Sequence, residues 1–250
     1  MSRGAAELFA QGLRDAFPVA SSTIQGIVCP SFPMLGILDL PPSFSLGAQT
    51  CASFEEGSYT GEVSASLLQA MGCDYVILGH SERRTLFGET NDLVRSKALQ
   101  VLTHGMKPIV CVGESFEVYD KNETKEYLKK QLEESMPDQD FILAYEPLWA
   151  IGTGRVASIL GIQEIHAFLK SLLEAHGLKH TPIIYGGSVT GENARSILAL
   201  PEVAGVLVGG ASLSLEEFST IMRSAYHPSV FPNRPLNSPH CHPRESGEPG

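Results

Sequence analysis

The sequence predicts an α/β protein in which a parallel sheet is covered by helices. Short apolar stretches rich in Val, Ile and Leu recur from about residue 23 to residue 213, separated by amphipathic stretches with helical periodicity. The apolar stretches show no clean alternation of polar and apolar residues, as expected when both faces of a strand are buried. Seven such stretches are compatible with an open doubly wound sheet or with a closed eightfold barrel.

The expected elements follow one another as strand-then-helix units, which build parallel sheets. The expected strands are short and rich in β-branched residues, and they are Thr23–Cys29, Ser45–Cys51, Tyr75–Gly79, Pro108–Val112, Phe141–Tyr145, Pro182–Tyr185 and Val206–Val208. The expected helices repeat apolar residues at three- and four-residue spacing, and they are Arg3–Phe17, Asn91–Thr103, Glu117–Glu134, Gly161–His176 and Glu192–Leu200. Gly-rich and Pro-rich turns connect these elements within one domain and do not mark domain boundaries.

The two ends of the sequence depart from this rhythm. The first expected element is a helix, and no strand is expected before it. Six prolines and almost no apolar periodicity occur from His227 onward. Because proline removes backbone donors and blocks helix continuation, we expect residues 227–250 to form a disordered tail. The sequence therefore predicts one domain over residues 1–226 and a proline-rich tail over residues 227–250.

Composition narrows the function. A net charge of −10 argues against nucleic acid or an anionic membrane surface as the main partner. The five cysteines are scattered, odd in number and without a CxxC pair, which favours reduced thiols in a cytoplasmic protein over a disulfide framework or a zinc site. We see no run of 18 apolar residues and no secretory leader, so we expect neither a membrane span nor a signal peptide.

Chemically active residue types follow several of the expected strands. His80 follows the strand that ends at Gly79, and Glu146 follows the strand that ends at Tyr145. Gly186-Gly187-Ser188 and Gly209-Gly210 come directly after the last two strands or close behind them. Because the carboxyl ends of parallel strands open to one face, these groups are expected to meet on one rim.

Each of these residues has a functional and a structural interpretation. Glu146 is a candidate general base if partial burial raises its pKa, and otherwise a solvated or N-capping carboxylate. His80 is a candidate hydrogen-bond donor to a substrate oxygen, or a structural histidine. Glu82 and Arg83, which follow His80 closely, are interpreted equally well as a pair of opposite charges on the surface. The glycine pairs suit phosphate binding by backbone N–H groups, or simply form tight turns.

The remaining histidines are expected to play no part in the chemistry. Four of them lie on or just after expected helices and are expected to be solvated: His104, His166, His176 and His180. His240-Cys241-His242 has metal-binding residue types but lies in the expected tail, where no fixed geometry is available, and we interpret it as a chance cluster.

Four segments resemble one family. Gly79–Arg84, Ala144–Gly154, Tyr185–Ser188 and Val208–Ala211 closely resemble motifs of triosephosphate isomerases, in that family's order and at its spacing. The likeness spans roughly residues 3–225. It implies a TIM (β/α)8 barrel that interconverts glyceraldehyde 3-phosphate and dihydroxyacetone phosphate without metal or cofactor, in glycolysis and gluconeogenesis.

The resemblance also implies catalytic roles. Glu146 would move a proton between neighbouring substrate carbons, and His80, kept neutral, would polarise the substrate oxygens of an enediolate. Triosephosphate isomerases are a standard example of a histidine held neutral at a helix N-terminus. The segment Pro147–Ala157 resembles the family's lid, which closes over the phosphate and excludes water.

Further residues resemble supporting parts of that site. The phosphate would be held by backbone N–H groups of Gly152, Ser188, Gly209 and Gly210. The lid and its supports would involve Glu82, Glu114, Trp149 and Tyr185, with Glu114 and Trp149 as an anchor and Tyr185 with Ser188 as a closed-state latch. Loop Cys51–Glu62 resembles the family's dimer loop, whose Thr60 would reach the partner subunit's site in a homodimer.

The sequence departs from the family pattern at its start. The family begins with a strand that ends in Asn-x-Lys, and Met1-Ser2-Arg3 stands where the residues just after that lysine would be. We therefore expect an N-terminally truncated member that lacks strand 1 and its catalytic lysine, through a misplaced start or a decayed gene. Lys97 and Lys107 are expected on a helix and at the opposite end of the barrel, so neither would replace it.

Two open sheet edges, impaired activity and a weakened homodimer would follow from this gap. The alternatives are an inactive remnant that at most binds phosphorylated ligands and, ranked lower, a different phosphate-binding barrel enzyme such as an aldolase or synthase.

Overall fold

The strands of the protein form one parallel sheet. The computed structural model describes residues 2–21, 23–55, 57–151 and 156–226. In these residues the sheet has seven strands in the order β1-β2-β3-β4-β5-β6-β7, and neighbouring strands are parallel throughout. The strands are β1 (Gly26–Val28), β2 (Phe44–Ala48), β3 (Cys73–Leu78), β4 (Lys107–Val112), β5 (Ile142–Tyr145), β6 (Ile183–Tyr185) and β7 (Gly205–Val206).

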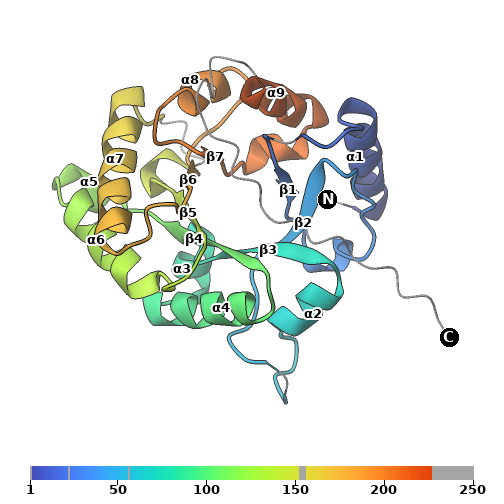
Figure 1. Cartoon of the computed structure of the whole chain (residues 1–250), viewed down its shortest axis with the longest axis horizontal. Helices are drawn as coiled ribbons and strands as arrows, with labels where there is room; N and C mark the ends of the chain where they lie inside the picture. Colours follow the sequence, from blue (N-terminus) through green and yellow to red (C-terminus); the bar gives the residue numbers. More distant parts are fainter. Residues whose placement is uncertain (1, 22, 56, 152–155, 227–250) are drawn as a thin grey trace.

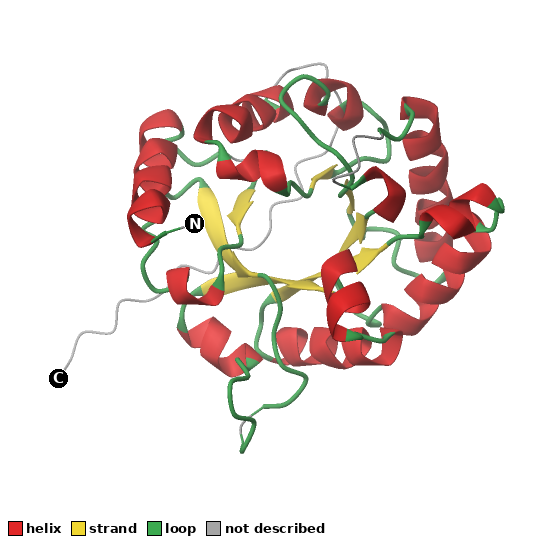
Figure 2. Ribbon diagram, turned by 180° about the vertical axis from the view of Figure 1, so that it is seen from behind, coloured by secondary structure: helices red, strands yellow, loops and turns green. Residues whose placement is uncertain are grey.

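The helices lie outside the sheet, and the strands curve around a common centre (Figures 1 and 2). The α-helices are α1 (Arg3–Ala16), α2 (Ala65–Ala70), α3 (Ser81–Phe87), α4 (Asn91–Thr103), α5 (Phe116–Asp120), α6 (Thr124–Ser135), α7 (Ile159–Ala175), α8 (Ala194–Leu198) and α9 (Leu215–Ala225). Short 3-10 helices occur at η1 (Phe32–Met34), η2 (Leu148–Ala150) and η3 (Gly210–Leu213). The predicted barrel-type α/β fold is confirmed.

Alternate residues of the strands build two apolar layers. In β5, Leu143 belongs to the layer between the sheet and the helices, whereas Ala144 belongs to the layer inside the curved sheet. In β4, Val110 and Cys111 divide between the two layers in the same way. Because successive side chains point to opposite faces of a strand, residue 146 continues the inward series of Ala144. The strand period thus aims the Glu146 side chain into the barrel.

The sheet has two edges in the described residues, at β1 and at β7, and no pairing joins them there. A separate apolar cluster lies near these edges, formed by Leu13, Phe17, Phe44, Phe218 and Met222. It contains side chains of α1, β2 and α9, and α1 contacts α9 directly. Helix packing therefore links the two ends of the sheet.

The structure corrects several element boundaries. The expected helix Glu117–Glu134 is two helices, α5 and α6, separated at Asn122, whose φ of 60° is left-handed and interrupts the helix. The expected strand Thr23–Cys29 is shorter, as is Val206–Val208. Residues 227–250, expected to be a tail, lie outside the described residues, so the 1–226 domain boundary stays a prediction. None of the described helices has the length and apolar character needed to cross a bilayer.

Candidate active site

His80 lies where β3 ends and α3 begins. Its φ of −50° and ψ of 146° are those of an N-cap residue, and its Nδ1 accepts the backbone N–H of Glu82 at 3.3 Å. A backbone N–H can only donate, so Nδ1 carries no proton and the proton of the neutral ring is on Nε2. The N-cap bond therefore fixes both the orientation and the tautomer of the imidazole.

Glu146 follows β5 directly and is almost completely buried, with 2% of its surface exposed. One carboxylate oxygen accepts the backbone N–H of Ser81 at 3.1 Å. Burial raises the pKa of Glu146 above its ordinary value, and this effect is partly offset by His80, the Ser81 N–H, the Cys111 thiol and the Arg84 guanidinium. A carboxylate with a raised pKa is a stronger base than a solvated one, which suits proton abstraction.

The two side chains meet at the centre of the site. The Nε2 atom of His80 lies 3.1 Å from an Oε atom of Glu146. The imidazole is 29% exposed, so it is accessible from the cavity while the carboxylate lies behind it. A proton donor and a proton acceptor are thus held within reach of one small molecule.

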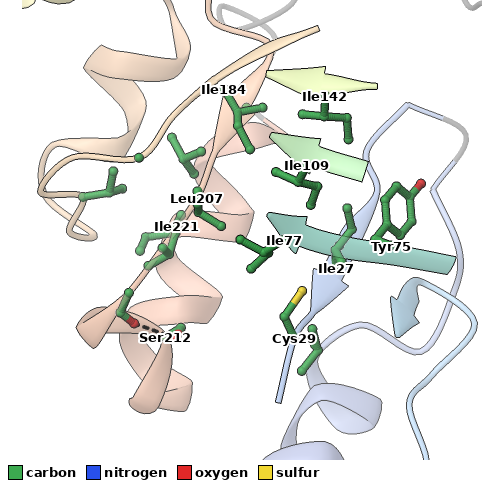
Figure 3. Close-up of a pocket in the computed structure, with 18 of the residues that line it drawn as sticks. Ile27, Cys29, Tyr75, Ile77, Ile109, Ile142, Ile184, Leu207, Ser212 and Ile221 are labelled. Carbon is green, nitrogen blue, oxygen red and sulfur yellow. Dashed lines mark hydrogen bonds between the residues drawn. The ribbon is translucent and has the colours of Figure 1, made fainter. Parts of the chain in front are cut away.

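The glycine-rich loops face the same space. A cavity of about 1700 Å³ is lined by His80, Glu146, Ser188, Gly209 and Gly210, among other residues. The cavity continues between the sheet edges into the interior of the barrel. Inward-pointing side chains of the strands line this interior, and Figure 3 shows five of them: Ile27, Ile77, Ile109, Ile142 and Ile184. The cavity is larger than a typical small-molecule site because it includes this interior.

The loop after β6 is held close to the carboxylate. The backbone N–H of Gly186 donates to the carbonyl of Tyr145 at 2.7 Å, and a Cβ on Gly186 would lie 2.8 Å from Cγ of Glu146. Farther along the loop, the Asn193 side chain donates to the Ser188 carbonyl at 3.0 Å. A residue with a side chain at position 186 would displace the carboxylate, so the close approach requires glycine there.

The residues that the sequence predicts as a lid anchor form a buried polar cluster. Glu114 has no exposed surface, and one of its oxygens accepts the Trp149 indole N–H at 2.9 Å and the Tyr145 hydroxyl at 3.1 Å. Burial raises the pKa of Glu114, and these donors partly offset the rise. The Trp149 ring also packs on Tyr119 with 4.3 Å between centroids. The start of the predicted lid is thus attached to the end of β4.

Tyr185 is the other lid residue predicted from the sequence. Its side chain is fully buried, and among the described residues its hydroxyl has no hydrogen-bond partner. It is close to the loop after β6, since a Cβ on Gly187 would lie 2.1 Å from the hydroxyl oxygen. A buried hydroxyl without a partner is unfavourable, so Tyr185 has unused hydrogen-bonding capacity beside this loop.

Two of the predicted residues, Thr60 and Glu82, have exposed side chains. Gly152 lies outside the described residues. Thr60 is exposed on the loop after β2, beside the stacked rings of Phe54 and Tyr59, and it does not line the cavity of its own chain. Glu82 contributes its backbone N–H to His80, while its carboxylate is 76% exposed.

Two interpretations of charged residues were wrong. Arg83 does not pair with Glu82, because its guanidinium lies 2.8 Å from the buried carboxylate of Glu89. Lys97 reaches the same carboxylate at 2.6 Å, so Glu89 holds two cations between α3 and α4. His166 is not solvated but has no exposed surface, and burial lowers its pKa to about 4. Its Nδ1 lies 3.2 Å from the Glu202 carbonyl, which only accepts, so Nδ1 carries the proton.

Sequence reasoning missed the residues behind the pair. Arg84 donates to the Gly79 carbonyl directly before His80 and to the Cys111 carbonyl on β4, and the Cys111 thiol lowers the pKa of Glu146. The only sequence signal was indirect, since Gly79 and Arg84 occur in one motif that resembles a known family. On a helix, an arginine is ordinarily read as a surface charge.

Comparison with known proteins settles the family. A family model described as Triosephosphate isomerase matches residues 1–225. The chain belongs to the triosephosphate isomerase family. It is 41% identical to the triosephosphate isomerase of Magnetococcus marinus over 233 residues, which are 87% of this chain and 91% of that protein. It is 42% identical to the Halorhodospira halophila protein (79% of this chain, 84% of that protein), and 45% identical to the Chlamydia trachomatis serovar L2 protein (80% and 77%).

Proposed function

We propose that this chain interconverts glyceraldehyde 3-phosphate and dihydroxyacetone phosphate through an enediolate. The observation that carries the proposal is the 3.1 Å approach of His80 Nε2 to the Glu146 carboxylate at the rim of the cavity that the glycine loops share. Membership of the triosephosphate isomerase family supports the choice of substrate.

The catalytic roles follow from the protonation states. Glu146, buried and of raised pKa, accepts the proton from the carbon beside the carbonyl and returns it to the neighbouring carbon. His80 donates from Nε2 to the substrate oxygens, because Nδ1 is occupied by the Glu82 N–H. Oxyanion stabilisation by such a fixed donor ordinarily contributes several kcal/mol, roughly 3 to 4, to a transition state.

The phosphate is assigned to the glycine loops. Backbone N–H groups of Ser188, Gly209 and Gly210 would bind it, together with Gly152 of the lid. Lid closure over the phosphate would exclude water, with Glu114 and Trp149 holding the lid base and Tyr185 receiving the closed lid with Ser188. No metal and no organic cofactor enters this scheme.

A homodimer in the cytoplasm completes the proposal. The exposed, stacked Phe54 and Tyr59 lie on the loop that carries Thr60, and an apolar loop tip of this kind suits a protein contact. Thr60 would then reach the partner's site. The four cysteines of the described residues are free thiols, which supports a reducing compartment.

A second candidate, phosphate-ligand binding without turnover, is favoured by the charges of the cavity. Two lysines, Lys170 and Lys179, line the cavity at the end of the barrel away from His80. The Lys170 ammonium group donates to the backbone carbonyl of Lys179, which precedes β6. Arg83, which also lines it, is held by Glu89. An anionic enediolate at this rim would receive little help from these cations.

An isomerase assay separates the two candidates. The chain is assayed with glyceraldehyde 3-phosphate beside Glu146→Gln, and beside a version extended at its amino end by a strand that ends in Asn-x-Lys. Turnover that disappears in E146Q supports the isomerase, and a marked gain in the extended version supports an impaired isomerase. Binding of a phosphoglycolate-type inhibitor with no turnover in any folded version supports the second candidate. Neither binding nor turnover contradicts both.

A further inference from the structure

We propose that Arg84 is a positioning residue for the isomerisation, which holds the backbone behind His80 and Glu146 and keeps a fixed positive charge beside the carboxylate. Arg84 lies on α3 and is partly buried. Among the described residues its guanidinium forms no ion pair with a carboxylate, whereas that of the neighbouring Arg83 pairs with the buried Glu89. It turns toward the ends of β3 and β4.

The guanidinium bonds the backbone of β3 directly before His80 and the backbone of β4, the strand beside the one that Glu146 follows. Nε donates to the Gly79 carbonyl at 2.7 Å, one residue before His80. Nη2 donates to the Cys111 carbonyl at 3.0 Å, and the thiol of the same Cys111 lowers the pKa of Glu146. One planar group therefore fixes the ends of two neighbouring strands at the points that orient the two functional side chains.

The other face of the guanidinium is anchored in the helix layer. Nη1 donates to Asn91 Oδ1 at 2.6 Å at the start of α4, and Nη2 lies 3.3 Å from the Ser135 hydroxyl at the end of α6. The hydroxyl of Ser135 also lies 3.1 Å from Asn91 Oδ1. With partners on both sides, the guanidinium has one arrangement, which a flexible ammonium cannot reproduce.

The fit against β3 is close. Gly79 has a φ of +66°, and a Cβ there would meet Arg84 Nη2 at 2.9 Å and Val94 at 2.7 Å. Glycine is therefore required both by the left-handed backbone and by the packing of the guanidinium onto it. This turn sets the direction in which His80 leaves the strand.

Arg84 also supplies charge to the site. The groups that act on the Glu146 carboxylate are His80 and the Ser81 N–H at the start of α3, Arg84 on the same helix and Cys111 on β4. Around Arg84 itself, the titratable neighbours are Cys111, Tyr127, Glu89 and Glu146. Of the groups that act on Glu146, only Arg84 has a permanent positive charge. It favours the ionised form of the base, against the effect of burial.

The test uses Arg84→Met, which removes the charge and the hydrogen bonds, and Arg84→Lys, which keeps the charge. The Glu146 carboxyl is followed by ¹³C NMR titration of glutamate-labelled protein, with Glu146→Gln identifying its signal, so this measurement does not depend on turnover. We expect the carboxyl of R84M to titrate about one pH unit higher than that of the unaltered chain, because an opposite charge has been removed. R84K should titrate close to the unaltered chain. Arg95→Met is the matched control, since Arg95 pairs with Asp138 on the surface.

Kinetics supply the second readout and rest on the proposed isomerase function. We expect kcat to fall about tenfold in R84M and less in R84K, with KM nearly unchanged, because Arg84 forms no hydrogen bond with Ser188, Gly209 or Gly210. An unaltered chain without turnover contradicts the proposed function but leaves the titration to decide on Arg84. Folded R84M with an unchanged Glu146 titration overturns the inference, as does a failure of both variants to fold, which would make the role purely structural.

Discussion

The middle of the sheet and its two edges differ in how firmly they are built. β3, β4 and β5 pair with one another over four residues at each junction, whereas β1 pairs over three residues and β7 over two. A middle strand is bonded on both sides, while an edge strand leaves backbone groups unpaired. His80 and Glu146 follow β3 and β5, and the exposed Gly209 and Gly210 follow β7.

The two parts of the proposed reaction, proton transfer and phosphate binding, therefore depend on different parts of the sheet. The proton-transfer groups depend on the continuous part of the sheet, where buried hydrogen bonds fix both side chains. The phosphate-binding loops depend on how well the edges are held, and there the contact of α1 with α9 replaces strand pairing. Chemistry and anion binding should therefore respond separately to substitution.

The largest expected effect is on chemistry in the middle of the sheet. Glu146→Asp draws the carboxylate back from the substrate by the length of one methylene, and a displacement of about 1 Å at a reacting group can cost roughly 100-fold in rate. We expect kcat to fall about 100-fold or more while the melting temperature changes little, as measured by steady-state kinetics and thermal unfolding. Glu133→Asp, a change of the same kind on exposed α6, is the control. A loss of less than tenfold in E146D would contradict the assignment of the base.

Stability should show the same contrast. Leu143 has no exposed surface in the middle of the sheet, whereas Ile27 of β1 is half-buried and faces the cavity. Leu143→Ala leaves a void in a packed layer and should lower the free energy of unfolding by about 3 kcal/mol. Ile27→Ala should cost about 1 kcal/mol, because its side chain already borders open space. Denaturant titration measures both, and equal losses would show that the edge is as well packed as the middle.

Sequence reasoning was accurate where the structure is most continuous. The expected strand Phe141–Tyr145 differs from β5 by one residue. A strand buried between two neighbours is a continuous apolar stretch, so its ends are visible in the sequence. The expected strand Thr23–Cys29 is shortened to β1, since an edge strand extends only as far as its one partner pairs with it. Composition does not record pairing, so these lengths could not be predicted.

The site divides in a similar way. His80 and Glu146 could be placed on one rim because parallel strands end on one face, and that rule needs no knowledge of contacts. Arg84 and His166 could not be predicted, since both lie on helices where such side chains are ordinarily solvated. Their burial depends on β4, β5 and β6, which are remote in the sequence.

His166 gives a pH-dependent test at the junction between the middle and the edge. It lies on α7 against Tyr145 of β5 and Tyr185 of β6, and burial lowers its pKa to about 4. The unfolded chain takes up this proton at a pKa of about 6.5, so the unfolded state binds more protons between these values and stability falls as the pH falls through them. The contribution is fully present above the unfolded pKa.

We expect the free energy of unfolding to lose roughly 2 to 3 kcal/mol from this group between pH 7 and pH 4.5, a loss that His166→Gln removes. Glutamine keeps a donor for the Glu202 carbonyl and does not titrate. His180→Gln, at an exposed position, is the control. The pH dependence is measured by urea unfolding, and an H166Q curve parallel to that of the unaltered chain would show that His166 is not buried in solution.

The smallest expected effects compare two glycines of the rim. A Cβ on Gly186 would lie 2.8 Å from Cγ of Glu146, whereas no atom lies within 4 Å of a Cβ on Gly210. Gly186→Ala should therefore displace the base and lower kcat by about tenfold, since misplacement acts on the chemical step. Gly210→Ala should leave kcat within about twofold and raise KM a few-fold, because the added methyl group affects only the approach of the phosphate. If the two variants shared one kinetic pattern, the loop after β7 would belong with the proton-transfer groups, and the proposed division between the middle and the edge of the sheet would be wrong.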